Sequence, residues 1–158
     1  MGKNHSKRAV FPAGQSKDKH AVVPPPKGGK QAIQKVPWEN EKPAWRVKNI
    51  EMCDPFGWHR IRPRDQRMIL QKLGDFESMT WSEILVKGKK FHHSVAITEL
   101  CYEAQARLER TCHKAELELV SLRLGGTERI WGAFNGRVLD LLWWDPKHLV
   151  CPSLKSHT

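Results

Sequence analysis

The chain has 158 residues, enough for one domain with a modest core, and a formal net charge of +10. No apolar run approaches the length of a membrane span, no secretory leader pattern is visible, and the four cysteines form no Cys-x-x-Cys pair. These features argue against a membrane-spanning protein and against a small protein stabilised by disulfides. They predict a cytoplasmic protein with free thiols, no metal and no cofactor.

Most of the charge lies at the N-terminus. Residues 1–37 hold eight Lys/Arg and one Asp, so +7 of the +10 lies there, whereas residues 38–158 hold 19 basic and 16 acidic side chains. The same segment is rich in Lys, Gly, Pro and Gln, with Pro24-Pro25-Pro26 and Gly28-Gly29 at its centre. We expect a disordered basic tail that either binds polyanions through counterion release or simply keeps the protein soluble.

Residues 38–63 bring the first cluster of aromatic side chains, including Trp38, Trp45 and Trp58. Pro43 and Pro55 interrupt this stretch, so we expect an irregular arm that packs on the domain rather than a regular element. The folded α+β domain is then expected over residues 64–158.

Three short helices are predicted next. The first begins at Pro63, because apolar residues recur at helical spacing after it. The second follows the capping box Thr80-Trp81-Ser82-Glu83 and ends at Gly88. The third is expected to be capped by Thr98.

The period changes to that of strands from about Val120. Three strands are expected, over residues 120–124, 129–134 and 138–144, and residues 148–151 could add a short fourth strand. Asn135-Gly136 between two apolar runs predicts a type I′ hairpin with Phe134 opposite Arg137. The predicted fold is therefore α+β, with three short helices packed on one face of a small twisted antiparallel sheet, behind the basic tail.

Alternation along the hairpin sorts its side chains onto two faces. The first face collects Ile130, Phe134, Leu139, Leu141 and Trp143 and is predicted to lie under the helices. The second face collects the charged and aromatic side chains Arg129, Trp131, Asp140, Leu142 and Trp144, and is predicted to be exposed. A three-residue loop at 125–127 places Arg123 beside Arg129 on this second face, whereas a two-residue loop would bury it.

Exposed arginines and indoles together predict binding of single-stranded RNA. Guanidinium groups bind phosphate, and indole rings provide a stacking surface for unpaired bases. The predicted RNA-binding residues are Trp131, Trp144, Lys155, Arg137 and Lys147. The alternative is that both tryptophans are half-buried and Arg129 pairs with Asp140.

Histidines near these strands could supply acid–base chemistry. Ribonucleases that need no metal deprotonate the 2′-OH and protonate the leaving oxygen, and histidine suits both transfers because its pKa lies near neutral pH. Arginines stabilise the charge on phosphorus. The predicted catalytic residues are Arg129, Arg123, His92, His93, His148 and His157.

Leu122-Arg123-Leu124, the glycine turn, Arg129 on the next strand, the hairpin and the trailing His148 resemble the RelE/ParE/HigB toxin superfamily. The resemblance covers about residues 64–151, and the segments Arg129-Ile130-Trp131-Gly132 and Trp143-Trp144-Asp145-Pro146-x-His148 are also similar to small bacterial and phage proteins. It implies either messenger RNA cleavage on the ribosome or gyrase inhibition, with Arg123 and Arg129 as the residues carried over. The sequence departs from that pattern in having no evident first strand, no lysine-rich helix, and tryptophans where a catalytic tyrosine is usual.

The leading hypothesis is a metal-independent, toxin-type ribonuclease that acts on mRNA, with a small acidic antitoxin as a possible partner. One alternative is a non-catalytic module that binds RNA, an antitoxin or gyrase. A phage or mobile-element accessory protein is the remaining alternative. No phosphate-loop pattern points to a nucleotide cofactor.

Overall fold

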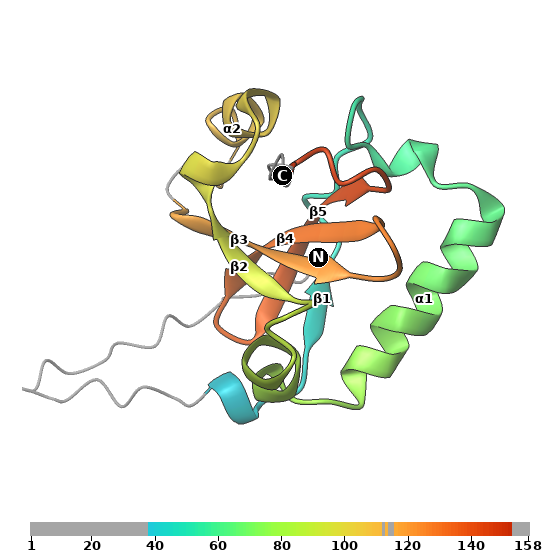
Figure 1. Ribbon diagram of the computed structural model, residues 1–158, viewed down its shortest axis with the longest axis vertical. Coiled ribbons are helices and arrows are strands. Elements are labelled where there is room, and N and C mark those ends of the chain that lie inside the picture. The colour runs from blue at the N-terminus through green and yellow to red at the C-terminus, as the bar shows by residue number, and fades with distance from the viewer. Residues whose placement is uncertain (1–37, 112, 114–115, 153–158) are drawn as a thin grey trace, which may run out of the picture. The chain divides into compact units, whose positions relative to one another are not determined.

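A computed structural model describes residues 38–111, 113 and 116–152 (Figure 1). The tail predicted over residues 1–37 lies outside these described residues, as do Lys155 and His157. Within the described ranges, no helix has the length and apolar character needed to cross a membrane.

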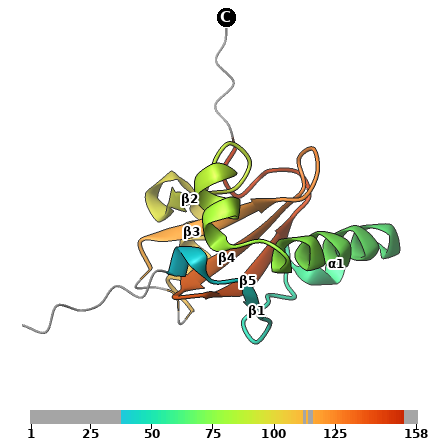
Figure 2. The same cartoon turned by 90° about the horizontal axis from the view of Figure 1, so that it is seen from below.

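The fold is α+β, as predicted. Its elements in chain order are η1 (Trp38–Asn40), β1 (Ala44–Arg46), η2 (Trp58–Arg60), α1 (Pro63–Glu77), η3 (Ser82–Lys87), β2 (His93–Ala96), η4 (Ile97–Glu99), α2 (Tyr102–Leu108), β3 (Glu118–Arg123), β4 (Arg129–Asn135) and β5 (Val138–Asp145). The five strands form one sheet in the order β1-β5-β4-β3-β2 (Figure 2). The sheet is mixed, because β1 runs parallel to β5 while the other neighbouring pairs are antiparallel.

Two strands were not predicted. β1 lies in the stretch expected to be irregular and pairs with β5, so that Arg46 lies opposite Asp140, 94 residues further along the chain. β1 is therefore a strand that precedes the helices, whereas the sequence pattern showed no evident strand there. β2 pairs with β3 along the other edge. Both strands are three or four residues long, too short to show a clear alternation.

Two of the three predicted helices begin where their caps place them. α1 starts at Pro63, and the capping box is formed, with Thr80 N donating to Glu83 Oε2 at 2.8 Å and Glu83 N donating to Thr80 Oγ1 at 3.3 Å. The third prediction was wrong at its start: α2 begins at Tyr102, and Thr98 lies in the preceding 3₁₀ turn. Cys101 is extended, and its N–H donates to Val150 O at 2.7 Å, which draws the backbone out of the helix.

The hairpin is present, but its register differs from the prediction. Asn135 pairs with Val138, so the central turn residues are Gly136 and Arg137. Gly136 has φ +69°, which fits a type II′ turn with glycine at the first central position. A β-bulge then leaves Leu142 without a partner, so Trp131 lies opposite Trp143 rather than opposite Asp140.

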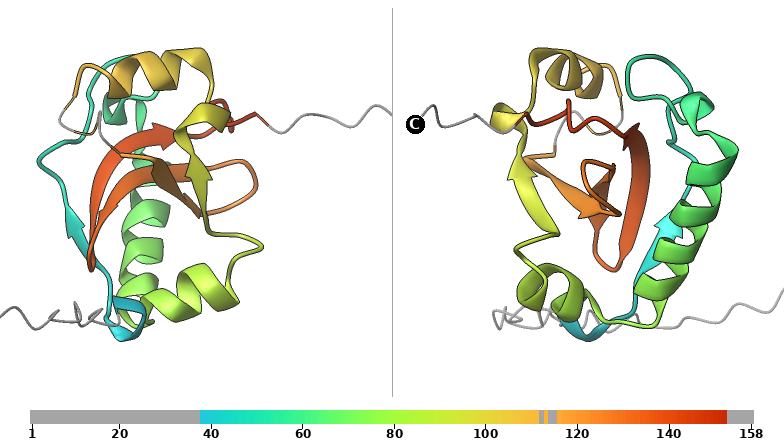
Figure 3. Two further views of the ribbon diagram at one scale, coloured as in Figure 1. Left: turned by 90° about the vertical axis from the view of Figure 1, so that its left-hand side faces the viewer. Right: turned by 45° about the vertical axis from the view of Figure 1, so that its right-hand side comes forward.

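Both faces of the sheet are covered, which overturns the expected bare second face (Figure 3). α1 and η3 cover the first face, together with the side chains of the 38–63 segment. α2 and Phe56 cover the second face, where Trp131 is 1% exposed. The bulge also exchanges the neighbouring tryptophans, so Trp143 packs on the second face and Trp144, also 1% exposed, packs on the first.

Candidate functional site

Positive side chains meet at the end of the sheet where β3 ends and β4 begins. Arg123 lies directly opposite Arg129, and His93 lies opposite Ser121, two residues before Arg123. Opposed residues share a face, and so do residues two apart, which places His93, Arg123 and Arg129 on the second face. The predicted neighbourhood of the two arginines is therefore confirmed.

The loop between β3 and β4 holds both guanidinium groups. Leu124 N donates to Glu128 O at 3.0 Å, which closes the three-residue loop predicted over 125–127. Arg123 Nε donates to Gly125 O at 2.6 Å, and Arg129 Nη1 donates to Gly126 O and Glu128 O at 3.1 Å each. The backbone carbonyls thus fix the two arginines and leave other N–H groups of each fork for a ligand.

His148 sits on a tight turn directly after β5. It has φ 59°, in the left-handed region that non-glycine residues seldom adopt. The buried carboxylate of Asp145 holds the turn by accepting from Leu149 N at 2.8 Å and Val150 N at 2.9 Å. Thr127 Oγ1 donates to Pro146 O at 2.7 Å and so ties this turn to the arginine-bearing loop. The predicted short strand over 148–151 is absent, because these contacts form a turn instead.

His92 is held in place by a hydrogen bond from the backbone of Arg123, on the neighbouring strand. Its Nδ1 accepts a hydrogen bond from Arg123 N at 3.1 Å, and its ring packs edge-on against Phe76 with centroids 5.0 Å apart. Burial, followed by the charges of Arg129, His93 and other cations, lowers the pKa of His92 to about 4. The ring is therefore neutral at pH 7. Because Nδ1 is the acceptor, the proton lies on Nε2.

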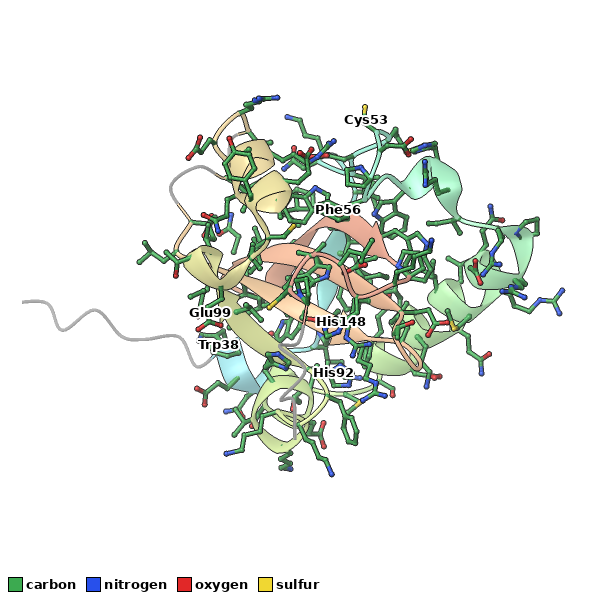
Figure 4. All side chains as sticks on the ribbon, turned by 45° about the horizontal axis from the view of Figure 1, so that its top comes forward. Trp38, Cys53, Phe56, His92, Glu99 and His148 are labelled. Atoms are coloured by element: carbon green, nitrogen blue, oxygen red, sulfur yellow. The ribbon has the colours of Figure 1, made fainter. Side chains whose placement is uncertain are left out.

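The same charges act on His148. Burial lowers its pKa, and the positive charges of Arg129, His93 and Arg123 add to this effect, while Asp145 opposes it. His148 therefore lies near Arg129, His93 and Arg123, whose charges act on it. His92 joins this group through its hydrogen bond from Arg123 N, while its ring packs against Phe76 of the first-face core. Figure 4 labels both histidines. We call this group the cationic cluster: His92, His93, Arg123, Arg129 and His148.

The arginines of the cationic cluster have acidic neighbours but no close ion pair: Asp145 lies opposite Arg129 in the β4–β5 pair, and the charges of Asp145 and Glu128 act on Arg129. In the part of the chain that the structure describes, neither Arg123 nor Arg129 has a carboxylate within 4.0 Å. Arg129 is 9% exposed, and desolvation, followed by the charge of Arg123, lowers its pKa. A buried Arg129 beside Arg123 favours a bound anion, because burial removes the water that otherwise solvates the Arg129 guanidinium group.

A second polar site at the hairpin end of the sheet is built differently. There Arg46 Nη1 forms an ion pair with the buried carboxylate of Asp140 at 2.8 Å, and His113 Nε2 lies 3.9 Å from the same carboxylate. Its charges are paired within the protein. The two sites therefore differ in that Arg46 has a close carboxylate partner, whereas among the described residues Arg123 and Arg129 have none within 4.0 Å.

The remaining predicted residues do not join the cationic cluster as expected. Trp131 and Trp144 cannot stack on bases, because the α2 segment, the bulge and the first-face core bury them. Arg137 lies in the hairpin turn, at the other end of β4 from Arg129. Lys147 is exposed in the turn that carries His148, while Lys155 and His157 lie outside the described residues.

Two contributors near the cationic cluster were missed. Lys72 of α1 adds to the positive charge that lowers the pKa of His92. Phe91, in the loop before His92, is 47% exposed, and its ring centroid lies 5.7 Å from Cζ of Arg123. The run Lys87-Gly88-Lys89-Lys90-Phe91-His92-His93 carried a usable signal, since an aromatic ring among basic residues is typical of nucleic-acid binding.

Comparisons of the chain with protein-family models, with curated proteins and with solved structures gave no match. Among the described residues, no group of three or more His, Cys, Asp or Glu side chains is placed to hold a metal ion. The chemistry of the cationic cluster itself therefore carries the functional argument.

Proposed function

We propose that this protein is a metal-independent ribonuclease of the RelE-like toxin type, with the cationic cluster as its active site. One observation carries the proposal: Arg123 lies opposite Arg129 at one end of the sheet, with His93 on the same face and His148 near enough for their charges to act on it. Among the described residues, no carboxylate lies within 4.0 Å of either arginine. A phosphodiester would supply a close negative partner for the two arginines. His93 and His148 supply the imidazoles proposed for the proton transfers.

The reaction is an attack of the ribose 2′-OH on the adjacent phosphorus. His148, kept neutral by its lowered pKa, accepts the 2′-OH proton as the new O–P bond forms. Arg123 and Arg129 stabilise the pentavalent phosphorane, whose negative charge exceeds that of the bound phosphodiester. The P–O5′ bond then breaks, and the leaving oxygen takes up a proton, for which His93 is the proposed donor. The products are a 2′,3′-cyclic phosphate and a 5′-hydroxyl end.

His92 has a positioning role in this scheme. Its Nδ1 is occupied by Arg123 N, and a pKa of about 4 makes it a poor proton carrier at pH 7. The proposed substrate of this site is RNA, and the proposed target is cytoplasmic mRNA, on or off the ribosome. The resemblance to the toxin superfamily adds an acidic antitoxin as a proposed partner.

The test is incubation of the purified full-length protein with end-labelled single-stranded RNA in EDTA, with and without ribosomes. We expect products ending in 2′,3′-cyclic phosphate. Arg129→Ala should lower the cleavage rate by about 10²–10³-fold, the usual effect of removing one preorganised charge-stabilising donor. Arg137→Ala is the matched control, because it removes an exposed arginine at the far end of the same hairpin.

Two results would refute the proposal. One is the absence of cleavage under both conditions, with RNA bound but intact, which would indicate a binding module. The other is a cleavage rate that Arg129→Ala and Arg137→Ala change equally.

A further inference from the structure

The loop between η3 and β2 presents an aromatic ring at the edge of the cationic cluster. Phe91 is 47% exposed, although most large apolar side chains of the domain are buried. Cζ of Arg123 lies 5.7 Å from its ring centroid, and Nζ of Lys90 lies 5.9 Å from it. The chain carries no acidic residue from Ile84 to Thr98, so the ring stands in a positively charged surrounding.

Hydrogen bonds within the loop hold it in place, in addition to its connections to η3 and β2. Phe91 N and His92 N both donate to Gly88 O, at 2.8 and 3.0 Å. His92 in turn accepts from Arg123 N, and its ring lies 6.4 Å from that of Phe91. The position of Phe91 relative to Arg123 is therefore set by the same hydrogen bonds that build the cationic cluster.

We propose that Phe91 is the stacking surface for an unpaired base of the substrate, so that the protein selects single-stranded over duplex RNA. This inference rests on the proposed function, in that it takes RNA as the ligand of the cationic cluster. A nucleotide whose base lies on Phe91 brings its phosphate to the adjacent Arg123. Bases inside a duplex are stacked on one another and cannot reach the ring.

The stacking role replaces the one that the sequence assigned to Trp131 and Trp144. Those indoles lie in the core, whereas Phe91 is the aromatic ring in contact with a cluster arginine. An aromatic ring flanked by cations is the usual arrangement for binding single strands, with the ring contacting the base and the cations following the backbone.

The experiment measures binding separately from cleavage. A fluorescein-labelled oligoribonucleotide, blocked against cleavage by 2′-O-methyl groups, is titrated with the full-length protein as a single strand and as a duplex. Phe91→Ala should weaken single-strand binding about 5- to 150-fold, the effect of losing one stacked base, and leave duplex binding unchanged. Phe91→Trp should preserve or strengthen single-strand binding.

Two controls separate stacking from charge and from folding. Tyr102→Ala removes an aromatic ring that is 85% exposed on α2 and should bind like the wild type. Phe91→Ala should leave the salt dependence of binding unchanged, whereas Arg123→Ala should reduce the slope of log K against log salt by about one. Thermal unfolding of each variant checks that the fold is retained.

The outcomes distinguish this inference from the ribonuclease proposal. Equal single-strand binding by Phe91→Ala and wild type, or equal weakening of duplex and single strand, overturns the stacking role even if RNA is cleaved. Single-strand binding that depends on Phe91 supports the stacking role even if no RNA is cleaved. A wild-type protein that binds neither RNA overturns both.

Discussion

Acidification should destabilise this protein through His92. The pKa of His92 falls from 6.5 to about 4 on folding, chiefly because the ring is buried, so the unfolded chain takes up a proton on this ring well before the folded protein does. The free energy of unfolding therefore decreases as the pH falls from 6.5 toward 4. The whole shift corresponds to at most about 3 kcal/mol, of which about 2 kcal/mol is lost by pH 5.

The assay is urea unfolding at pH 7.5 and pH 5 for the wild type and His92→Asn. Asparagine can accept from Arg123 N through its side-chain oxygen but does not titrate, so this variant keeps the hydrogen bond and loses the pH response. His148 and the carboxylates titrate in both proteins, and their contributions cancel in the difference. We expect His92→Asn to lose about 2 kcal/mol less than the wild type between the two pH values. Equal losses in the two proteins would refute a buried, neutral His92.

Three further predictions concern residues that position the site. Trp131→Ala should lower the free energy of unfolding by about 3–5 kcal/mol, measured in urea, because it opens a cavity under α2; a loss below about 1 kcal/mol would mean that the indole is exposed after all. Asp145→Ala should abolish RNA cleavage in a protein that still folds, because Leu149 N and Val150 N lose their acceptor and the turn carrying His148 is released; cleavage at the wild-type rate would remove His148 from the mechanism. Gly136→Ala should cost about 1–2 kcal/mol in thermal unfolding because of its φ of +69°, and an unchanged Tm would argue against the type II′ turn.

Short-range features of the fold were predictable because neighbouring residues create them. The start of α1 follows from Pro63 and the apolar period after it, and the reciprocal bonds between Thr80 and Glu83 follow from their spacing. The three-residue loop that sets Arg123 beside Arg129 was also correct. It was argued from the cost of burying Arg123 away from an exposed second face, but the structure covers that face and leaves Arg129 only 9% exposed.

Features that depend on distant segments were missed. β1 is a strand because it pairs with β5, and nothing within residues 44–46 signals that pairing. The bulge at Leu142 reverses the faces of Trp143 and Trp144, although simple alternation placed them the other way round. A one-residue bulge cannot be recognised from a period-two pattern, yet it determines which side chains pack on each face of the sheet.

The sequence alone determined which kinds of side chain would meet at the end of the sheet, because a strand–loop–strand unit positions its own arginines. The tertiary structure decided which aromatic ring is exposed beside these arginines. The α2 segment, inserted between two strands, covers the second face and buries Trp131, while Phe91 stays half-exposed in a loop. The burial of a side chain depends on every segment that packs on it, whereas a turn is closed by a few adjacent residues. For that reason the arginines could be placed from the sequence and the stacking surface could not.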